Sequence, residues 1–222
     1  MNQSDSPEWR NDGVPVSPRF DDPYFSLENG LDETRHTFIA GNRLPDRFRD
    51  GFHIAELGFG TGLNLLATLF EWRRSGSPGV LCFTTFEAYP MAADDMIRAQ
   101  SRFSELHEIS QELEPFWREG AQEIALPDLH FRMVPGDARV TVPRWYSMAD
   151  AWYLDGFSPA KNPEMWGARL LDDVARHTNP GGTAATYTAA GHVRRALQEA
   201  GFHVERVAGY SNKRHMTVAH LP

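Results

Sequence analysis

Short apolar runs alternate with longer segments of helical periodicity through most of the chain. The apolar runs are bounded by turn residues and predict strands over residues 52–57, 80–86, 129–134, 149–154 and 182–187. The segments between them have apolar positions at helical spacing and predict helices over 62–74, 91–101, 104–119, 163–177 and 190–200. Strands that alternate with helices indicate a parallel sheet with helices on both faces.

The end of the chain departs from this alternation. Residues 202–207 and 215–221 are two strand-like runs with no helix between them, so we predict a closing antiparallel hairpin. A Rossmann-like, doubly wound α/β sheet that is mostly parallel and ends in such a hairpin resembles the class I S-adenosylmethionine-dependent methyltransferases. A nicotinamide dehydrogenase would continue with another strand–helix unit. We therefore expect the class I methyltransferase fold.

The length of 222 residues and the 41% hydrophobic content suit one medium-sized domain with a full core. Residues 1–23 are polar and rich in proline, and we expect them to form a loose leader. Residues 25–47 predict an extended piece and a turn. We expect a single domain over residues 24–222.

The formal net charge of −8 does not indicate a nucleic-acid-binding protein, although a local positive patch can still serve one. The later part of the chain carries Lys161, Arg169, Arg176, Arg194, Arg195, Arg206, Lys213 and Arg214. Solvated helix faces are at least as good an interpretation of most of these cations.

Other classes are disfavoured by the composition. A lone Cys82 cannot form an internal disulfide, which suits a reducing cytosol, so we expect a cytoplasmic protein. No apolar run approaches the roughly 20 residues of a membrane-spanning helix. The histidines have no paired-ligand spacing, and we expect no metal.

The run from His53 to Asn64 is the most informative motif. A strand-like segment ends in an acid and three glycines at alternate positions, and a helical segment follows. Such glycines let the backbone approach a ligand and present N–H groups at a helix N-terminus. A carboxylate beside the loop suits the positive sulfonium and α-amino groups of S-adenosylmethionine, which we expect as the cofactor. The expected cofactor-binding residues here are Glu56, Gly58, Phe59, Gly60, Gly62 and Asn64.

Two further predicted strands end in acids that suit the adenosine part of this cofactor. Glu87 is placed to accept both ribose hydroxyls, and the alternative is an exposed acid that caps the next helix. Asp137, with Ala138 beside it, is placed to accept from the adenine amino group. An Asx turn after Gly136 is a rival interpretation of Asp137, and the two roles are compatible.

The strand over 149–154 leads into Asp155, followed by a loop rich in glycine, proline and aromatic residues. An acid in this place suits the binding of an amine beside the methyl donor, and we expect Asp155 to be catalytic and to contact the cofactor. The alternative is a buried acid that only ties the loop to backbone N–H groups. The expected substrate-binding residues are Phe157, Pro159, Lys161, Asn162 and Trp166, with the two aromatics as base-stacking candidates. Lys161 and Asn162 either contact a phosphate or base, or only shape the loop.

With these residues in view, the chain resembles the methyltransferase domain of the MnmC family, bacterial enzymes that complete 5-methylaminomethyl-2-thiouridine in tRNA. The resemblance runs from about residue 20 to residue 218. The phrases that carry it are residues 20–26, 30–38 with 41–42, 58–64, 155–166, 190–195 and 213–216. One departure is Ala88, where the family usually has a lysine after the ribose-binding acid.

The resemblance implies transfer of a methyl group to the exocyclic amine of 5-aminomethyl(-2-thio)uridine at the tRNA wobble position, with the anticodon loop as partner. It also implies that residues 24–50 form a lid over the cofactor, with Asn42 near the amino-acid end of that cofactor. The family's second domain, an FAD-dependent oxidase, is absent from this sequence. We expect a separate or fused oxidase as a further partner.

Three other functions stay open at this point. The first is a class I methyltransferase that acts on a small-molecule amine. The second is a nicotinamide oxidoreductase, against which Glu56 and the predicted hairpin argue. The third is a non-catalytic module that binds S-adenosylmethionine.

Overall fold

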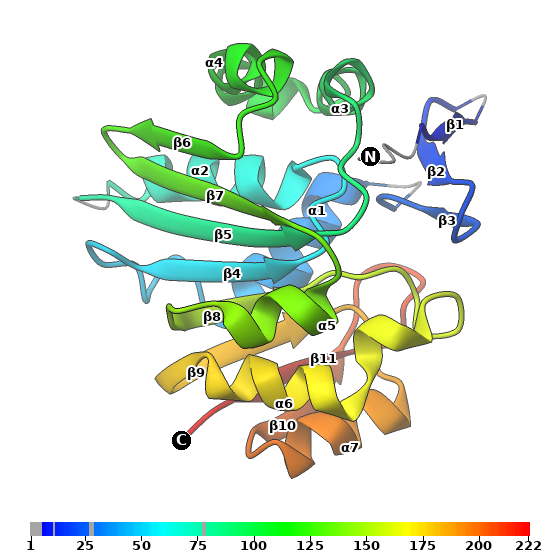
Figure 1. The fold of residues 1–222 in the computed structure, drawn as a ribbon, viewed down its shortest axis with the longest axis vertical. Helices are drawn as coiled ribbons and strands as arrows, with labels where there is room; N and C mark the ends of the chain where they lie inside the picture. The colour runs from blue at the N-terminus through cyan, green and yellow to red at the C-terminus, as the bar shows by residue number, and fades with distance from the viewer. Residues whose placement is uncertain (1–5, 11, 27–28, 77–78) are drawn as a thin grey trace.

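The computed structural model describes residues 6–10, 12–26, 29–76 and 79–222 (Figure 1). Within these residues an eight-stranded sheet has the order β10-β11-β9-β8-β4-β5-β7-β6. The strands are β4 (His53–Leu57), β5 (Leu81–Glu87), β6 (Glu123–Leu126), β7 (Leu129–Pro135), β8 (Ala149–Leu154), β9 (Thr178–Thr186), β10 (His203–Ala208) and β11 (His215–His220). Every predicted strand is present, and the expected mixed α/β fold is confirmed.

The pairing of the strands defines where a ligand can bind. β4, β5, β7, β8 and β9 are parallel, whereas β11 pairs antiparallel with both β10 and β9. From the central strand β4 the chain first adds β5 and β7 on one side and then β8 and β9 on the other. This reversal of direction leaves a crevice at the carboxyl ends of β4 and β8, where ligands bind in such sheets.

Helices cover both faces of the sheet (Figure 1). The helices after the N-terminal segment are α2 (Leu63–Arg74), α3 (Ala93–Gln100), η3 (Ser104–Leu106), α4 (His107–Arg118), α5 (Ala138–Thr141), η4 (Val142–Arg144), η5 (Pro163–Trp166), α6 (Ala168–Arg176) and α7 (Gly191–Glu199). One core cluster joins α2 and α4 to Tyr153 of β8, and the other joins α5, α6 and α7 to Trp152 of the same strand. Neighbouring residues of a strand point to opposite faces, so β8 is buried on both sides and reads as a continuous apolar run.

The N-terminal segment differs most from the expectations. Where we anticipated a loose leader, the described residues form a small antiparallel sheet of β1 (Glu8–Trp9), β2 (Pro15–Ser17) and β3 (Asp22–Pro23). The indole Nε1 of Trp9 donates to Asp95 at 3.0 Å, and Asp22 accepts from the amide of Ser158 at 2.9 Å. These contacts reach far along the chain, and local pattern does not reveal them.

The extended piece predicted within residues 25–47 is wrong, because this segment is helical. It forms α1 (Gly30–Thr34), the π-helical η1 (Arg35–Ile39) and the 3₁₀ turn η2 (Ala40–Asn42). Asn29 caps α1 by accepting from the amide of Asp32 at 3.2 Å. Phe38 and Ile39 are buried in the core, so burial stabilises a segment whose own pattern is weakly helical.

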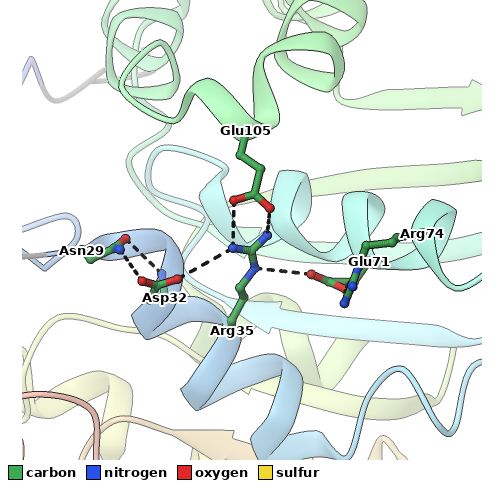
Figure 2. Close-up of polar contacts among 6 residues, drawn as sticks. All are labelled: Asn29, Asp32, Arg35, Glu71, Arg74 and Glu105. Carbon is green, nitrogen blue, oxygen red and sulfur yellow. Dashed lines mark hydrogen bonds and ion pairs between the residues drawn. The ribbon is translucent and has the colours of Figure 1, made fainter.

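Arg35 fixes this segment to the rest of the fold (Figure 2). Its Nη1 donates to Glu105 at 3.0 Å, and its Nε lies 3.3 Å from Glu71 of α2. Glu105 belongs to η3, so one guanidinium joins three segments. The Glu71 carboxylate is only 6% exposed and also pairs with Arg74. Partial burial makes such a pair worth more than an ordinary surface ion pair.

We predict that Arg35→Ala lowers the free energy of unfolding by about 1–2 kcal/mol, because buried Glu71 and the η3 segment lose their shared partner. Urea denaturation followed by far-UV circular dichroism measures this change. The matched control is Arg118→Ala, which removes two ion pairs on the exposed surface of α4 and is expected to leave the midpoint unchanged. Equal shifts for both variants would contradict this role of Arg35.

Candidate active site

A cavity of about 820 Å³ opens at the carboxyl ends of β4, β5 and β8. The loops that follow these strands form its floor, and residues between 19 and 26 together with α1 form its cover. The turn between β10 and β11 adds residues 210–213 to the wall. The predicted site residues that line it are Gly58, Phe59, Gly60, Asn64, Glu87, Asp137, Ala138, Asp155, Phe157, Lys161 and Asn162.

The glycine loop brings three strand ends to one point. The amide of Gly58 donates to the carbonyl of Phe86 at 2.9 Å, and the amide of Asp155 donates to the carbonyl of Leu57 at 3.1 Å. Gly58 has φ +89°, and a Cβ there would lie 2.6 Å from the carbonyl oxygen of Asp155. Only glycine fits this position, because both the conformation and the close contact exclude a side chain.

Glu87 holds the glycine loop from the end of β5. Its Oε2 accepts from the amides of Phe59 at 2.9 Å and Gly60 at 3.2 Å, and its Oε1 accepts from the amide of Tyr89 at 2.8 Å. A carboxylate has about four acceptor positions. Three are therefore used by the protein, and the remaining one suits a single ribose hydroxyl rather than the pair that we expected.

Asn64 joins two acids beneath the cavity. Its Nδ2 donates to Glu56 at 2.9 Å and to Asp155 at 2.7 Å, and its Oδ1 accepts from the hydroxyl of Thr34 at 2.9 Å. Glu56 is fully buried and also accepts from Thr85 at 2.8 Å. Burial raises the pKa of Glu56 well above its ordinary value, against the effect of these two hydrogen bonds.

Glu56 therefore has a different role from the one that we expected. Its side chain points from β4 toward α2 and does not line the cavity. It orients Asn64, which in turn reaches Asp155. Gly58, Phe59, Gly60 and Asn64 of the sequence motif line the cavity, whereas Glu56 does not.

Asp155 lies at the base of the cavity. Burial raises the pKa of Asp155 to about 7, the hydrogen bond from Asn64 lowers it, and the negative charge of Glu33 raises it further. Glu33 of α1 forms an ion pair with Lys213, whose Nζ lies 4.2 Å from the ring centre of Tyr187. The hydroxyl of Tyr187 donates to the carbonyl of Gly156 at 2.7 Å.

Glu33, Lys213 and Tyr187 are cavity residues that the sequence analysis did not assign. Glu33 lies in a segment predicted to be extended, so its position over Asp155 was hidden. Tyr187 follows β9 directly, and its place at the carboxyl end of a parallel strand was the available signal.

The loop after β8 supplies an aromatic wall. Phe157 stacks on Phe20 with ring centres 4.7 Å apart and meets the edge of Tyr24 at 5.2 Å. Phe20 in turn lies 6.1 Å from Tyr89. Lys161 pairs with Asp21 and Asp22 of the N-terminal sheet, so it closes the cover over this wall.

Trp166 and Pro159 support the loop and do not line the cavity. Trp166 is 3% exposed within the core cluster beneath the loop, and its Nε1 donates to the carbonyl of Phe157 at 2.8 Å. The expectation that Trp166 stacks on a base is not supported, because its ring is already packed. Pro159 lies in a turn closed by the amides of Lys161 and Asn162, which both donate to the carbonyl of Ser158 at 2.8 Å.

Asn42 and Gly62 also lie outside the cavity lining. The Asn42 amide is fully buried, donating to the carbonyl of Phe38 at 2.9 Å and accepting from Thr183 at 2.6 Å. The expected contact between Asn42 and a cofactor is not supported, because these contacts commit the amide to the fold. Gly62 has φ +75° and begins α2, which suits its place in the loop.

Asp137 begins α5 at the carboxyl end of β7. Its carboxylate accepts from the amide of Arg139 at 2.9 Å and pairs with the Arg139 guanidinium at 2.6 Å. The hydrogen bond from Arg139 lowers the pKa of Asp137. This i to i+2 contact is the Asx turn that was the rival interpretation of Asp137, and Asp137 lines the cavity together with Ala138.

A second cavity of about 530 Å³ is lined mainly by residues of η1, η2, β9, β10 and β11. Among the described residues no three metal-ligating side chains gather in one place, and none of the helices has the length and apolar character to span a membrane. Cys82 is half-buried on β5, where burial raises the pKa of its thiol.

The sheet order and the cavity at its switch point are the architecture of class I methyltransferases. A family model described as S-adenosyl-L-methionine-dependent methyltransferase matches residues 104–222, and the chain belongs to this family.

Two relatives extend the comparison. The tRNA 5-methylaminomethyl-2-thiouridine biosynthesis bifunctional protein MnmC of Aliivibrio fischeri is 40% identical over 96% of this chain. The chain spans 34% of the length of that relative. The crystal structure of MNMC2 from Aquifex aeolicus superposes with a TM-score of 0.76 and 25% identity, over 98% of this chain and 70% of that one.

The cavity residues fit S-adenosylmethionine. The glycine loop permits close approach of a ligand, and Glu87 keeps an acceptor position beside it. Asp155 and Glu33 add carboxyl groups to the same cavity, and these groups suit a sulfonium and an amine. The cavity volume of about 820 Å³ lies within the usual range for cofactor sites, roughly 300–1,000 Å³.

The raised pKa of Asp155 predicts a pH dependence of stability. The folded protein holds this proton up to about pH 7, whereas the unfolded chain loses it near pH 4. The stabilising effect is therefore complete below about pH 4 and is lost as the pH rises toward 7, with a slope of at most about 1.4 kcal/mol per pH unit. Urea denaturation at several pH values measures it. Asp155→Asn is expected to show a flatter profile between pH 5 and 7, and an identical profile would contradict the shift.

Proposed function

We propose that this methyltransferase modifies the exocyclic amine of 5-aminomethyl(-2-thio)uridine at the wobble position of tRNA. The similarity to MnmC and to MNMC2 supports this substrate. Because the chain spans only part of MnmC, substrate and partners are part of the proposal. The observation that carries it is the Asp155 carboxyl, which lies in the same cavity as the aromatic wall around Phe157.

This cavity suits a modified base with an amine arm. A nucleotide in a single-stranded loop leaves its stack easily and is held by stacking on an aromatic ring. Phe157 and Phe20 provide such rings above the base of the cavity. Asp155 lies where an amine carried by the base would need an acceptor.

Methyl transfer from a sulfonium to an amine requires mainly that the enzyme position the two reacting groups. S-adenosylmethionine supplies a methyl group on a sulfonium, which is already a good leaving group. The attacking amine must be neutral, with its lone pair directed at the methyl carbon. Asp155 accepts a hydrogen bond from this amine and so aligns it, while Asn64 fixes the carboxylate at 2.7 Å. A carboxyl with a pKa near 7 is also suited to exchange a proton with the amine at neutral pH.

The amine substrate must come from an enzyme that produces the aminomethyl group. The proposal includes an FAD-dependent oxidase in this role, either fused or separate, and a cytoplasmic location where tRNA is available. The relative from Aliivibrio fischeri is a bifunctional protein, which supports a second activity alongside methyl transfer.

The direct test is incubation with methyl-labelled S-adenosylmethionine and tRNA from cells that lack this modification step, followed by digestion and identification of the labelled nucleoside. We expect label in 5-methylaminomethyl(-2-thio)uridine. Asp155→Asn is expected to lower kcat by at least about a hundredfold while changing the Kd for S-adenosylmethionine by less than about tenfold. The control Asp128→Asn alters an acid that pairs with Arg73 far from the cavity and should keep full activity.

Absence of label in tRNA, alongside measurable binding of S-adenosylmethionine, would overturn the substrate. A small-molecule amine would then be the better interpretation. Full turnover by Asp155→Asn would overturn the alignment role while leaving the substrate intact.

A further inference from the structure

A group of arginines lies beside the cavity and takes no part in the chemistry above. It consists of Arg194 and Arg195 on α7, Arg206 on β10 and Arg214 at the end of the β10–β11 turn. Arg195, Arg206 and Arg214 are exposed, and Arg194 is half-buried. We refer to these four residues as the arginine cluster.

The strand register and two side-chain hydrogen bonds place Arg194 of α7 close to Arg206 of the hairpin. Arg206 lies opposite Thr217 in the hairpin, and the hydroxyl of Thr217 donates to the carbonyl of Thr188 at 2.7 Å. The next residue, Ala189, accepts from the Nε of Arg194 at 3.3 Å. α7 and the hairpin are thereby tied at the point where both carry arginines.

The charges of the cluster act on their surroundings. Burial, together with the positive charges of Arg206, Arg214 and Arg194, lowers the pKa of His215. In the part of the chain that the structure describes, none of the four arginines forms an ion pair. The cavity cations differ, because Lys161, Lys213 and Arg139 each have a carboxylate partner. Like charges that gather without partners repel each other, so the cluster suits an anionic ligand.

The cluster borders the mouth of the cavity. Residues 210–213 of the β10–β11 turn line the cavity, and Arg214 follows them directly. The start of α7 follows the carboxyl end of β9 (Figure 1), and Asp155 follows the carboxyl end of β8, which is parallel to β9. A ligand that enters the cavity therefore has the cluster beside it.

We propose that the arginine cluster binds RNA backbone phosphates next to the nucleotide whose base enters the cavity, an inference that rests on the proposed function. Guanidinium groups match phosphate oxygens with paired hydrogen bonds. A protein with net charge −8 has no general attraction to RNA. A local positive cluster lets an acidic protein bind tRNA, because it attracts the phosphates of the RNA backbone only beside the cavity that the base must enter.

The test compares Arg206→Ala with Arg144→Ala. Arg144 is also exposed and free of ion pairs among the described residues, but it lies in η4, before the amino end of β8. Binding of unmodified tRNA is measured by fluorescence anisotropy over a series of salt concentrations. We expect Arg206→Ala to weaken binding several-fold at low salt and to reduce the slope of log K against log salt by about 1. Arg144→Ala should match the wild type, and the Kd for S-adenosylmethionine should stay constant in both.

Arg206→Glu adds a charge reversal and should weaken tRNA binding further without altering the thermal midpoint. Equal tRNA binding by the wild type and Arg206→Ala would overturn the inference. An equal loss of tRNA binding in Arg206→Ala and Arg144→Ala would also overturn it. Failure of the proposed function is distinguishable, because the wild type would then bind tRNA with the cluster-dependent salt slope and yet transfer no label to it. If the wild type labels tRNA and Arg206→Ala leaves the KM for tRNA unchanged, the proposed role of the arginine cluster is refuted while the proposed function stands.

Discussion

The hydrogen bonds from one amide group, that of Asn64, to Glu56 at 2.9 Å and Asp155 at 2.7 Å organise the site. These hydrogen bonds join the first turn of α2 to β4 and to the residue that follows β8, at the switch point of the sheet. The close contact between Gly58 and the Asp155 backbone fixes the same strands from the other side. The position of Asp155 therefore depends on the sheet and on α2 rather than on its own loop.

Two acids held this way have an electrostatic cost. Burial disfavours their charged forms, and it raises the pKa of both Asp155 and Glu56. A positive ligand relieves that cost when it enters the cavity, because its charge favours ionised Asp155. The same arrangement that destabilises the empty charged site thus favours a sulfonium or an amine over a neutral ligand. Glu33 adds to this preference, and Lys213 limits it.

The sequence was sufficient for most of the alternating core of the fold, since apolar runs and glycine turns determine β4, β5, β7, β8 and β9 locally, whereas the short strand β6 was not predicted. The sequence also placed Glu87 and Asp155 at one edge of the sheet, where both line the cavity, because the carboxyl ends of parallel strands share one edge. The sequence pattern was insufficient for the segments whose structure depends on contacts between residues far apart in the chain. The N-terminal sheet depends on Asp22 and Ser158, which are distant in sequence. The family resemblance implied a cofactor contact for Asn42, and the aromatic loop suggested base stacking by Trp166, but both side chains are committed to contacts within the fold.

The pKa of about 7 predicts that Asp155 is about half protonated at pH 7 and ionises next to a cationic ligand. Calorimetric titration with S-adenosylmethionine at pH 7, in buffers of different ionisation enthalpy, measures the protons released. We predict that wild type releases roughly half a proton more than Asp155→Asn, and that this excess shrinks with S-adenosylhomocysteine, whose sulfur is neutral. Equal release by wild type and Asp155→Asn would contradict the account.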